Sequence, residues 1–215
     1  MKTRLFFIPI FAVLVVLNGA TTVQSLNPPF STIASNASDT TNWKKGSIDL
    51  KKSSSRLLFS YPNEWKLRKD NFFGYIEFSY GPDVSFTRFD SEIFDGSAVI
   101  HSSAKSTIDA IQEYLTNKGF QLNSRSTDFF PSVEESSSGP VPPKIVSRGR
   151  KIFIAVFKNK KYYVRVDAKV YYFKTYSGQP DGYANLLICP EDSYDSKYES
   201  IFTKIEESFS KEYKK

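Results

Sequence analysis

Hydrophobic and polar residues alternate most regularly in the stretch Lys161–Lys174. Every second side chain there is apolar or small, so these side chains would share one face of an extended chain. The preceding stretch, Lys151–Phe157, is almost continuously apolar, and Lys158-Asn159-Lys160 has the composition of a turn. The pattern predicts an antiparallel hairpin with one buried face and one face toward water. The buried face would carry Tyr162, Val164, Val166, Ala168, Val170 and Tyr172, and the wet face Lys161, Tyr163, Arg165, Asp167, Lys169 and Tyr171.

A second hairpin is predicted upstream, where Phe72–Tyr80 and Val84–Phe89 flank Gly81-Pro82-Asp83. Before it, a short apolar run ends at Tyr61-Pro62, because proline cannot donate to a strand ladder. Trp65 follows the turn and is expected to point into a core. The remaining short apolar segments predict single strands at Leu57–Ser60, Ala98–His101, Phe120–Thr127 and Tyr183–Cys189.

Two stretches have the longer period of an amphipathic helix, Ser106–Lys118 and Asp195–Phe209. In the first, Ile108, Ile111 and Leu115 fall on one face. Strands in antiparallel succession, combined with two helices, predict an α+β fold in which a central antiparallel sheet carries helices on its faces. The apolar stripe of the second helix would consist of Tyr198, Ile201, Phe202, Ile205 and Phe209.

The N-terminus has the pattern of a secretory signal peptide over Met1–Ser25. Lys2 and Arg4 precede the apolar run Leu5–Leu17, which is too short for a typical membrane-spanning helix. The protein is therefore expected to be exported to a periplasmic, extracellular or otherwise extracytoplasmic location. A signal that stays uncleaved and anchors the protein to a membrane is the alternative.

The rest of the chain divides by composition into a leader and one domain. Residues 26–52 are rich in Ser, Thr and Asn, which predicts a flexible leader. Residues 53–212 are expected to form a single α+β domain. Within it, residues 132–143 are rich in Ser, Gly and Pro, which predicts a mobile loop.

Positive charge is concentrated in Lys144–Lys174, which holds ten Lys and Arg residues against one Asp, in a chain of net charge +6. On the predicted wet face, Tyr163 and Tyr171 interleave with Arg165 and Lys169, and these four are the candidates for partner binding. Such a face would suit an acidic protein surface or an anionic envelope component. Nucleic acid is not expected as a partner outside the cell. A solvated sheet face with tyrosines packed along it is the alternative.

Other candidate chemistry is sparse. The single histidine, His101, excludes a histidine-based triad, and the sequence holds no G-x-S-x-G elbow, glycine-rich phosphate loop or C-x-x-C pair. The single cysteine, Cys189, is expected to be buried. No catalytic residue and no cofactor are therefore predicted. Asp90, Glu92 and Asp95 offer the carboxylate oxygens that calcium prefers, although a solvated acidic loop is the alternative.

Two short motifs stand at the ends of the predicted domain, Phe59-Ser60-Tyr61-Pro62-Asn63-Glu64-Trp65-Lys66 and the closing Ser208-Phe209. Together with the order of elements, they resemble PsbP-like domains, the superfamily of an extrinsic photosystem II protein. The chain departs from the usual opening pattern by lacking one residue between Ser60 and Tyr61-Pro62. The resemblance covers roughly Ser53–Phe209 and implies an α/β/α sandwich, of a non-photosynthetic prokaryotic type.

The resemblance also implies a function. PsbP-like proteins are exported, are mostly not enzymes, and the best known dock on photosystem II and help to retain calcium and chloride. We therefore expect a non-catalytic interaction or assembly module that docks on a membrane complex or envelope component, with no specified oligomeric state. The alternative is a carrier of a small ligand or cation, or an enzyme of unrecognised type, that uses a pocket between the sheet and the helices.

Overall fold

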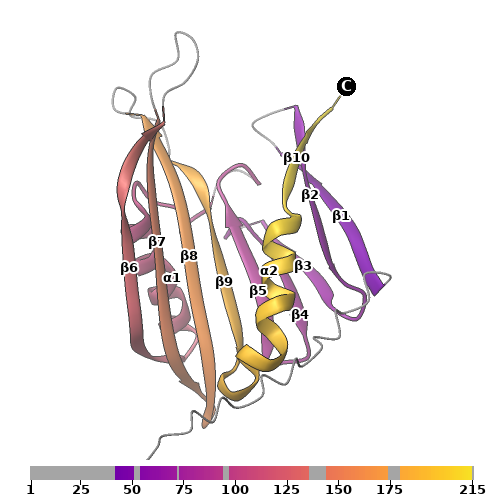
Figure 1. Cartoon of the computed structure of the whole chain (residues 1–215), viewed down its shortest axis with the longest axis vertical. Helices are drawn as coiled ribbons and strands as arrows, with labels where there is room; N and C mark the ends of the chain where they lie inside the picture. The colour runs from indigo at the N-terminus through magenta and orange to yellow at the C-terminus, as the bar shows by residue number, and fades with distance from the viewer. Residues whose placement is uncertain are drawn as a thin grey trace, which may run out of the picture. The chain divides into compact units, whose positions relative to one another are not determined.

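Antiparallel strand pairing dominates the structure, a computed structural model that describes residues 42–50, 54–71, 73–93, 97–135, 144–173 and 180–214 (Figure 1). The larger sheet has seven strands in the order β3-β4-β5-β9-β8-β7-β6, and the smaller has three in the order β1-β2-β10. The strands are β1 Trp43–Asp49, β2 Ser55–Pro62, β3 Lys66–Asp70, β4 Tyr75–Tyr80, β5 Val84–Asp90, β6 Gln121–Glu135, β7 Lys144–Phe157, β8 Lys160–Phe173, β9 Asp181–Pro190 and β10 Ser210–Tyr213.

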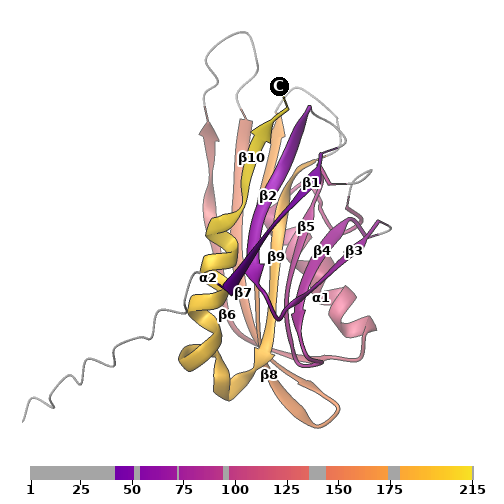
Figure 2. The same cartoon turned by 90° about the vertical axis from the view of Figure 1, so that its right-hand side faces the viewer.

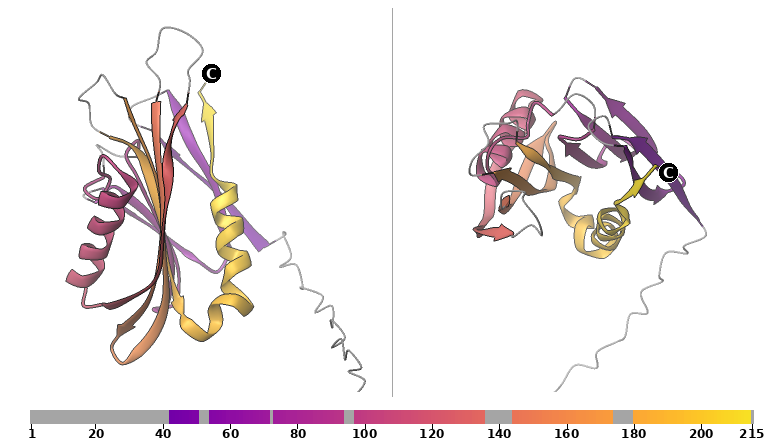
Figure 3. Two further views of the ribbon diagram at one scale, coloured as in Figure 1. Left: turned by 60° about the vertical axis from the view of Figure 1, so that its left-hand side comes forward. Right: turned by 90° about the horizontal axis from the view of Figure 1, so that it is seen from above.

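The two α-helices lie on opposite faces of the larger sheet (Figure 3). Helix α1, Ala104–Asn117, packs on β6, β7 and β8. Helix α2, Glu199–Ser208, lies on the other face, next to the three-stranded sheet (Figure 2). The predicted α+β architecture, a central antiparallel sheet with helices on its faces, is confirmed.

Each face of the larger sheet has its own hydrophobic core, because successive side chains of a strand point to opposite sides. On the α1 side, Ile108, Ile111 and Leu115 are fully buried against strand residues such as Val164 and Val166. The core on the other side lies between the large sheet, α2 and the small sheet. Its central residues include Leu57, Phe59, Trp65, Phe78, Phe86, Phe202 and Ile205.

Both predicted hairpins are confirmed. Val84–Asp90 returns along Tyr75–Tyr80, and β8 returns along the whole of β7. The turn between β7 and β8 places Lys158 and Asn159 at positive φ, 49° and 63°, which is the geometry of a tight two-residue hairpin turn.

The helix predicted at Ser106–Lys118 is confirmed, although it begins two residues earlier. Ser103 is the N-cap, and its side chain and that of Ser106 exchange hydrogen bonds with each other's backbone amides. The helix ends where Gly119 takes a φ of 94°, a conformation that favours glycine.

The C-terminal segment differs from the single helix expected at Asp195–Phe209. A 3₁₀ turn, Glu191–Ser193, leads into a π-helical turn, Tyr194–Tyr198, before α2 begins. After α2 the chain forms β10, which pairs with β2. All four residues of β10 are exposed, so no apolar pattern marked this strand in the sequence.

Three other sequence predictions are corrected. The flexible leader at 26–52 is wrong for Trp43–Asp49, which form β1 and pair with β2 along their whole length. The predicted mobile loop at 132–143 is wrong for its first four residues, because Ser132–Glu135 continue β6 and pair with the start of β7. The strand expected at Ala98–His101 is a turn and coil segment.

The remaining parts of those predictions lie outside the described residues. This applies to the signal peptide at Met1–Ser25, to most of the leader, and to 136–143 of the predicted loop. The described residues all belong to one compact unit, Asp39–Lys215. Within the described part of the chain, no helix is long and apolar enough to cross a membrane.

Candidate functional site

The predicted wet face of β8 is partly covered by the C-terminal segment. Tyr163 is 7% exposed and Arg165 6% exposed. The ring of Tyr194 stacks on that of Tyr163 with 3.8 Å between centroids. The prediction of two solvent-facing binding residues is therefore wrong, because strand alternation shows which side chains share a face but not what packs on it.

Arg165 is held instead by a network of internal contacts. Its Nη2 donates to Glu206 Oε2 at 2.7 Å, its Nε to Asp167 Oδ2 at 2.6 Å, and its Nη1 to the Tyr194 hydroxyl at 3.0 Å. Burial opposes the charged form, but the two carboxylates outweigh it and raise the pKa of the guanidinium. This residue ties α2 and the π-helical turn to the sheet.

Beyond the covered part, the same face of the sheet opens into a groove of about 430 Å³, which we call the basic groove. Strand register explains its composition, since Arg88, Asn185, Asp167 and Arg150 lie side by side across β5, β9, β8 and β7. The neighbouring row consists of Tyr183, Lys169, Arg148 and Phe130. The end of α2 contributes Glu206.

The lining of the basic groove has an excess of positive charge, four cationic side chains against two carboxylates. Both carboxylates, Asp167 and Glu206, also bind the buried Arg165. The guanidinium of Arg88 lies 3.8 Å from the ring centroid of Tyr183 and pairs with Asp90 at 3.0 Å. The groove therefore offers a positive field on a largely fixed framework.

Lys169 is a half-buried cation of the groove. It forms no salt bridge with the described residues, and its ammonium lies 5.0 Å from the ring centroid of Tyr171. Of the four residues predicted to bind a partner, the structure thus brings Lys169 and Tyr171 together and removes Tyr163 and Arg165 from the surface.

An unsatisfied polar atom lies in the lining of the groove. Asn185 is 6% exposed, and its Nδ2 donates to Glu206 Oε1 at 3.3 Å. Its Oδ1 is buried and has no hydrogen-bond partner among the described residues. Buried acceptors without a donor are uncommon in folded proteins, so a donor at this position would stabilise the groove.

An exposed apolar patch lies beside the groove on β6, which is an edge strand of the large sheet. Phe130 and Val133, on the groove side of β6, are 54% and 53% exposed, whereas Phe129 lies on the α1 side, against Gly149. An edge strand presents backbone donors and acceptors to an incoming chain, and apolar side chains on it favour contact with another protein.

The predicted cation site is not assembled in the described residues. Asp90 is buried and accepts hydrogen bonds from the Arg88 side chain and from the Glu92 backbone amide. The Glu92 carboxylate pairs with Lys211. Burial raises the pKa of the Asp90 carboxyl, despite the attraction of Arg88. Asp95 lies outside the described residues.

No group of three or more potential metal ligands occurs in the described ranges of the chain. Cys189 is buried as expected, and burial raises the pKa of its thiol to about 12. His101 is exposed, and its backbone amide donates to the Thr107 hydroxyl. Neither residue lines the basic groove.

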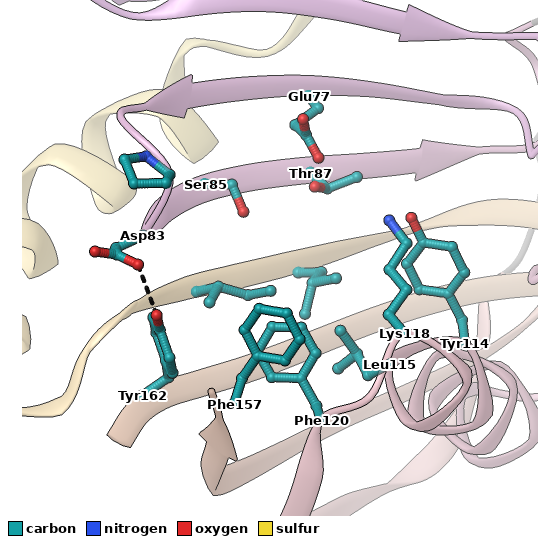
Figure 4. Close-up of a pocket in the computed structure, with 13 residues that line it drawn as sticks. Glu77, Asp83, Ser85, Thr87, Tyr114, Leu115, Lys118, Phe120, Phe157 and Tyr162 are labelled. Carbon is teal, nitrogen blue, oxygen red and sulfur yellow. Dashed lines mark hydrogen bonds between the residues drawn. The ribbon is translucent and has the colours of Figure 1, made fainter. Parts of the chain in front are cut away.

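A second hollow lies on the opposite face of the large sheet, at the C-terminal end of α1 (Figure 4). We call it the α1 pocket, and its volume is about 220 Å³. The helix packs on β6–β8, and its Tyr114 also contacts Phe89 of β5. The pocket is lined by Glu77, Pro82, Asp83, Ser85, Thr87, Tyr114, Leu115, Lys118, Phe120, Phe157, Tyr162, Leu186 and Ile188.

Sequence reasoning missed most residues of both hollows. Arg148 and Arg150 lay within the basic segment, but their meeting with Arg88 depends on the strand order β5-β9-β8-β7. No local signal connects Glu77 with Lys118, which the fold brings to one pocket from β4 and from the end of α1.

Comparison with models of protein families and with curated proteins finds no match for this chain. The resemblance to PsbP-like domains therefore stays a prediction, and the functional argument depends on the geometry of the two hollows.

Proposed function

We propose that this protein is a non-catalytic interaction module that docks on an acidic partner protein through the basic groove. The observation that carries the proposal is the net positive lining of one open groove, which includes the half-exposed Arg150 and also Lys169, a lysine without a salt bridge among the described residues. Guanidinium groups bind carboxylates in a planar, two-point geometry, which makes an acidic segment the chemically matched occupant.

A protein is favoured as the partner because the groove is bordered by exposed apolar side chains. Phe130 lines the groove itself, and Val133 lies further along the same edge strand. Aromatic residues and arginine are enriched at the centres of protein interfaces.

The proposed setting is extracytoplasmic, next to a membrane complex or envelope component. This setting is inferred from the N-terminal signal pattern of the sequence.

Charge reversal at Lys169 tests the proposal. We expect Lys169→Glu to weaken binding of a fluorescent octaglutamate peptide by about tenfold at low salt, because it reverses a charge that faces the groove. The matched control is Lys66→Glu, which makes the same charge change on the exposed surface of β3, at the other edge of the sheet. Anisotropy titrations at two salt concentrations provide the measurement, and raised salt should remove most of the binding.

Equal weakening by both variants would show that only net charge matters and would contradict a specific groove. Vesicles of anionic lipid, titrated in parallel, distinguish an acidic protein partner from an anionic lipid. Binding to vesicles but not to the peptide would favour an envelope lipid over a protein.

A further inference from the structure

One side of the α1 pocket is apolar. Leu115, Leu186 and Ile188 come from the helix and the sheet, and the rings of Phe120 and Phe157 stack with 4.6 Å between centroids. Figure 4 shows the aromatic pair on the opposite side of the pocket from the β4–β5 hairpin. Such a surface would gain free energy by covering a small apolar group.

The rest of the lining is polar and includes the charged side chains Glu77 and Lys118. Glu77 projects from β4 beside Thr87, and Lys118 follows the last turn of α1 (Figure 4). The Lys118 ammonium lies 4.3 Å from the ring centroid of Tyr114, which holds it at the pocket. Neither Glu77 nor Lys118 forms a salt bridge with another described residue, so both charges remain free for a ligand.

The other carboxylate of the pocket is already bound within the protein. Asp83 accepts hydrogen bonds from the Tyr162 hydroxyl at 2.6 Å and from Lys160 Nζ at 2.9 Å. These bonds lower the pKa of Asp83, with the Tyr162 bond as the largest cause. Glu77 is therefore the carboxylate that a ligand cation would meet.

We propose that the α1 pocket binds a small zwitterionic ligand, of the size and chemistry of a free apolar α-amino acid. The ligand ammonium would pair with Glu77, its carboxylate with Lys118, and its side chain would lie on the apolar surface. The volume of about 220 Å³ is below the usual range for drug-sized ligands, which favours a ligand of this small size.

This binding site is separate from the proposed docking function, because the α1 pocket and the basic groove lie on opposite faces of the sheet and share no lining residue. Glu77, Thr87, Leu186 and Val166 form one row across β4, β5, β9 and β8 on the α1 side. Loss of either activity can therefore be measured without loss of the other.

Isothermal titration of the full chain with L-leucine and L-phenylalanine tests the proposal. Two analogues of leucine each lack one charge: 3-methylbutylamine has no carboxylate, and 4-methylpentanoate has no ammonium. We expect at least one of the two amino acids to bind at concentrations of about 1 mM, and each analogue of leucine to bind at least about tenfold more weakly than leucine. If both amino acids bind, the two analogues are compared with leucine.

Variants place the binding in the α1 pocket. Glu77→Gln and Lys118→Met should each weaken amino-acid binding by about tenfold, because each removes one ion pair. Glu113→Gln is the matched control, since Glu113 is exposed on α1 and does not line the pocket. Thermal unfolding of each variant checks that it folds.

Three results would overturn the inference. They are absence of binding by both amino acids at about 10 mM, equal binding of 3-methylbutylamine and leucine, and unchanged binding in Glu77→Gln. Binding of octaglutamate to the basic groove should be unaffected by the pocket variants, so failure here leaves the docking proposal standing.

Discussion

Replacing Arg165 by methionine is expected to lower the free energy of unfolding by about 3–5 kcal/mol, because the change leaves two partly buried carboxylates, Asp167 and Glu206, without the buried guanidinium that binds both. Glu206 would lose its cation and Tyr194 its hydrogen-bond donor. Urea denaturation followed by circular dichroism measures the loss.

Two further variants separate this effect from a general loss of charge. Arg150→Met removes a guanidinium from the same Asp167, but the Arg150 side chain is 47% exposed, so we expect a cost of at most about 1 kcal/mol. Adding Glu206→Leu to Arg165→Met should recover part of the loss, because it removes one of the unpaired carboxylates. A cost below about 1 kcal/mol for Arg165→Met would contradict the buried network.

Truncating Phe202 to alanine is expected to cost a similar amount, about 3–5 kcal/mol, by leaving a cavity beneath α2. Phe202 is fully buried, and its ring lies 6.1 Å from that of Trp65 and 6.4 Å from that of Phe86, measured between centroids. Its contact with Phe86 links α2 to β5 of the large sheet.

Ile201→Ala on the same helix is the control, because Ile201 is only partly buried and should cost about 1 kcal/mol. Tryptophan fluorescence adds a local readout, since Trp65 contacts the substituted ring. Equal costs for the two alanine variants would mean that α2 is not anchored through Phe202.

The sequence predicted the elements whose pattern is local. The apolar stripe Ile108, Ile111 and Leu115 and the alternation along β8 each follow from the period of one element. Strand β1 was not predicted because its residues are mostly exposed and polar, so no apolar alternation marks it. Its pairing with β2 is visible only in the folded structure. At Gly46 in β1 a Cβ would overlap the ring of Phe59, a packing constraint that is invisible in the segment alone.

The site residues were harder to predict, because burial on a sheet face depends on what packs there. Tyr163 and Lys169 alternate in phase on β8, yet Tyr194 stacks on the first while the second lines the basic groove. The basic composition of the hairpin could be predicted from the sequence. The position of Arg88 beside it could not, because it depends on the order of the strands in the sheet.

The two proposed sites differ in their binding chemistry, although they share one sheet. The basic groove is wide, charged and bordered by an exposed edge strand, which suits a macromolecule. The α1 pocket is small and has an apolar surface, which suits a small molecule. An amino acid bound under α1 would lie against β9 and β8, the strands that also form the groove, so coupling between the two sites can be tested by repeating the peptide titration with leucine present.

The most direct test of the docking proposal is photo-crosslinking in the native cell, with a photoreactive amino acid at position 169 in one strain and at position 66 in another. We expect a reproducible crosslink to an acidic protein from position 169 and none to that protein from position 66. Crosslinks to the same protein from both positions, or to lipid alone from position 169, would contradict docking of a protein in the basic groove.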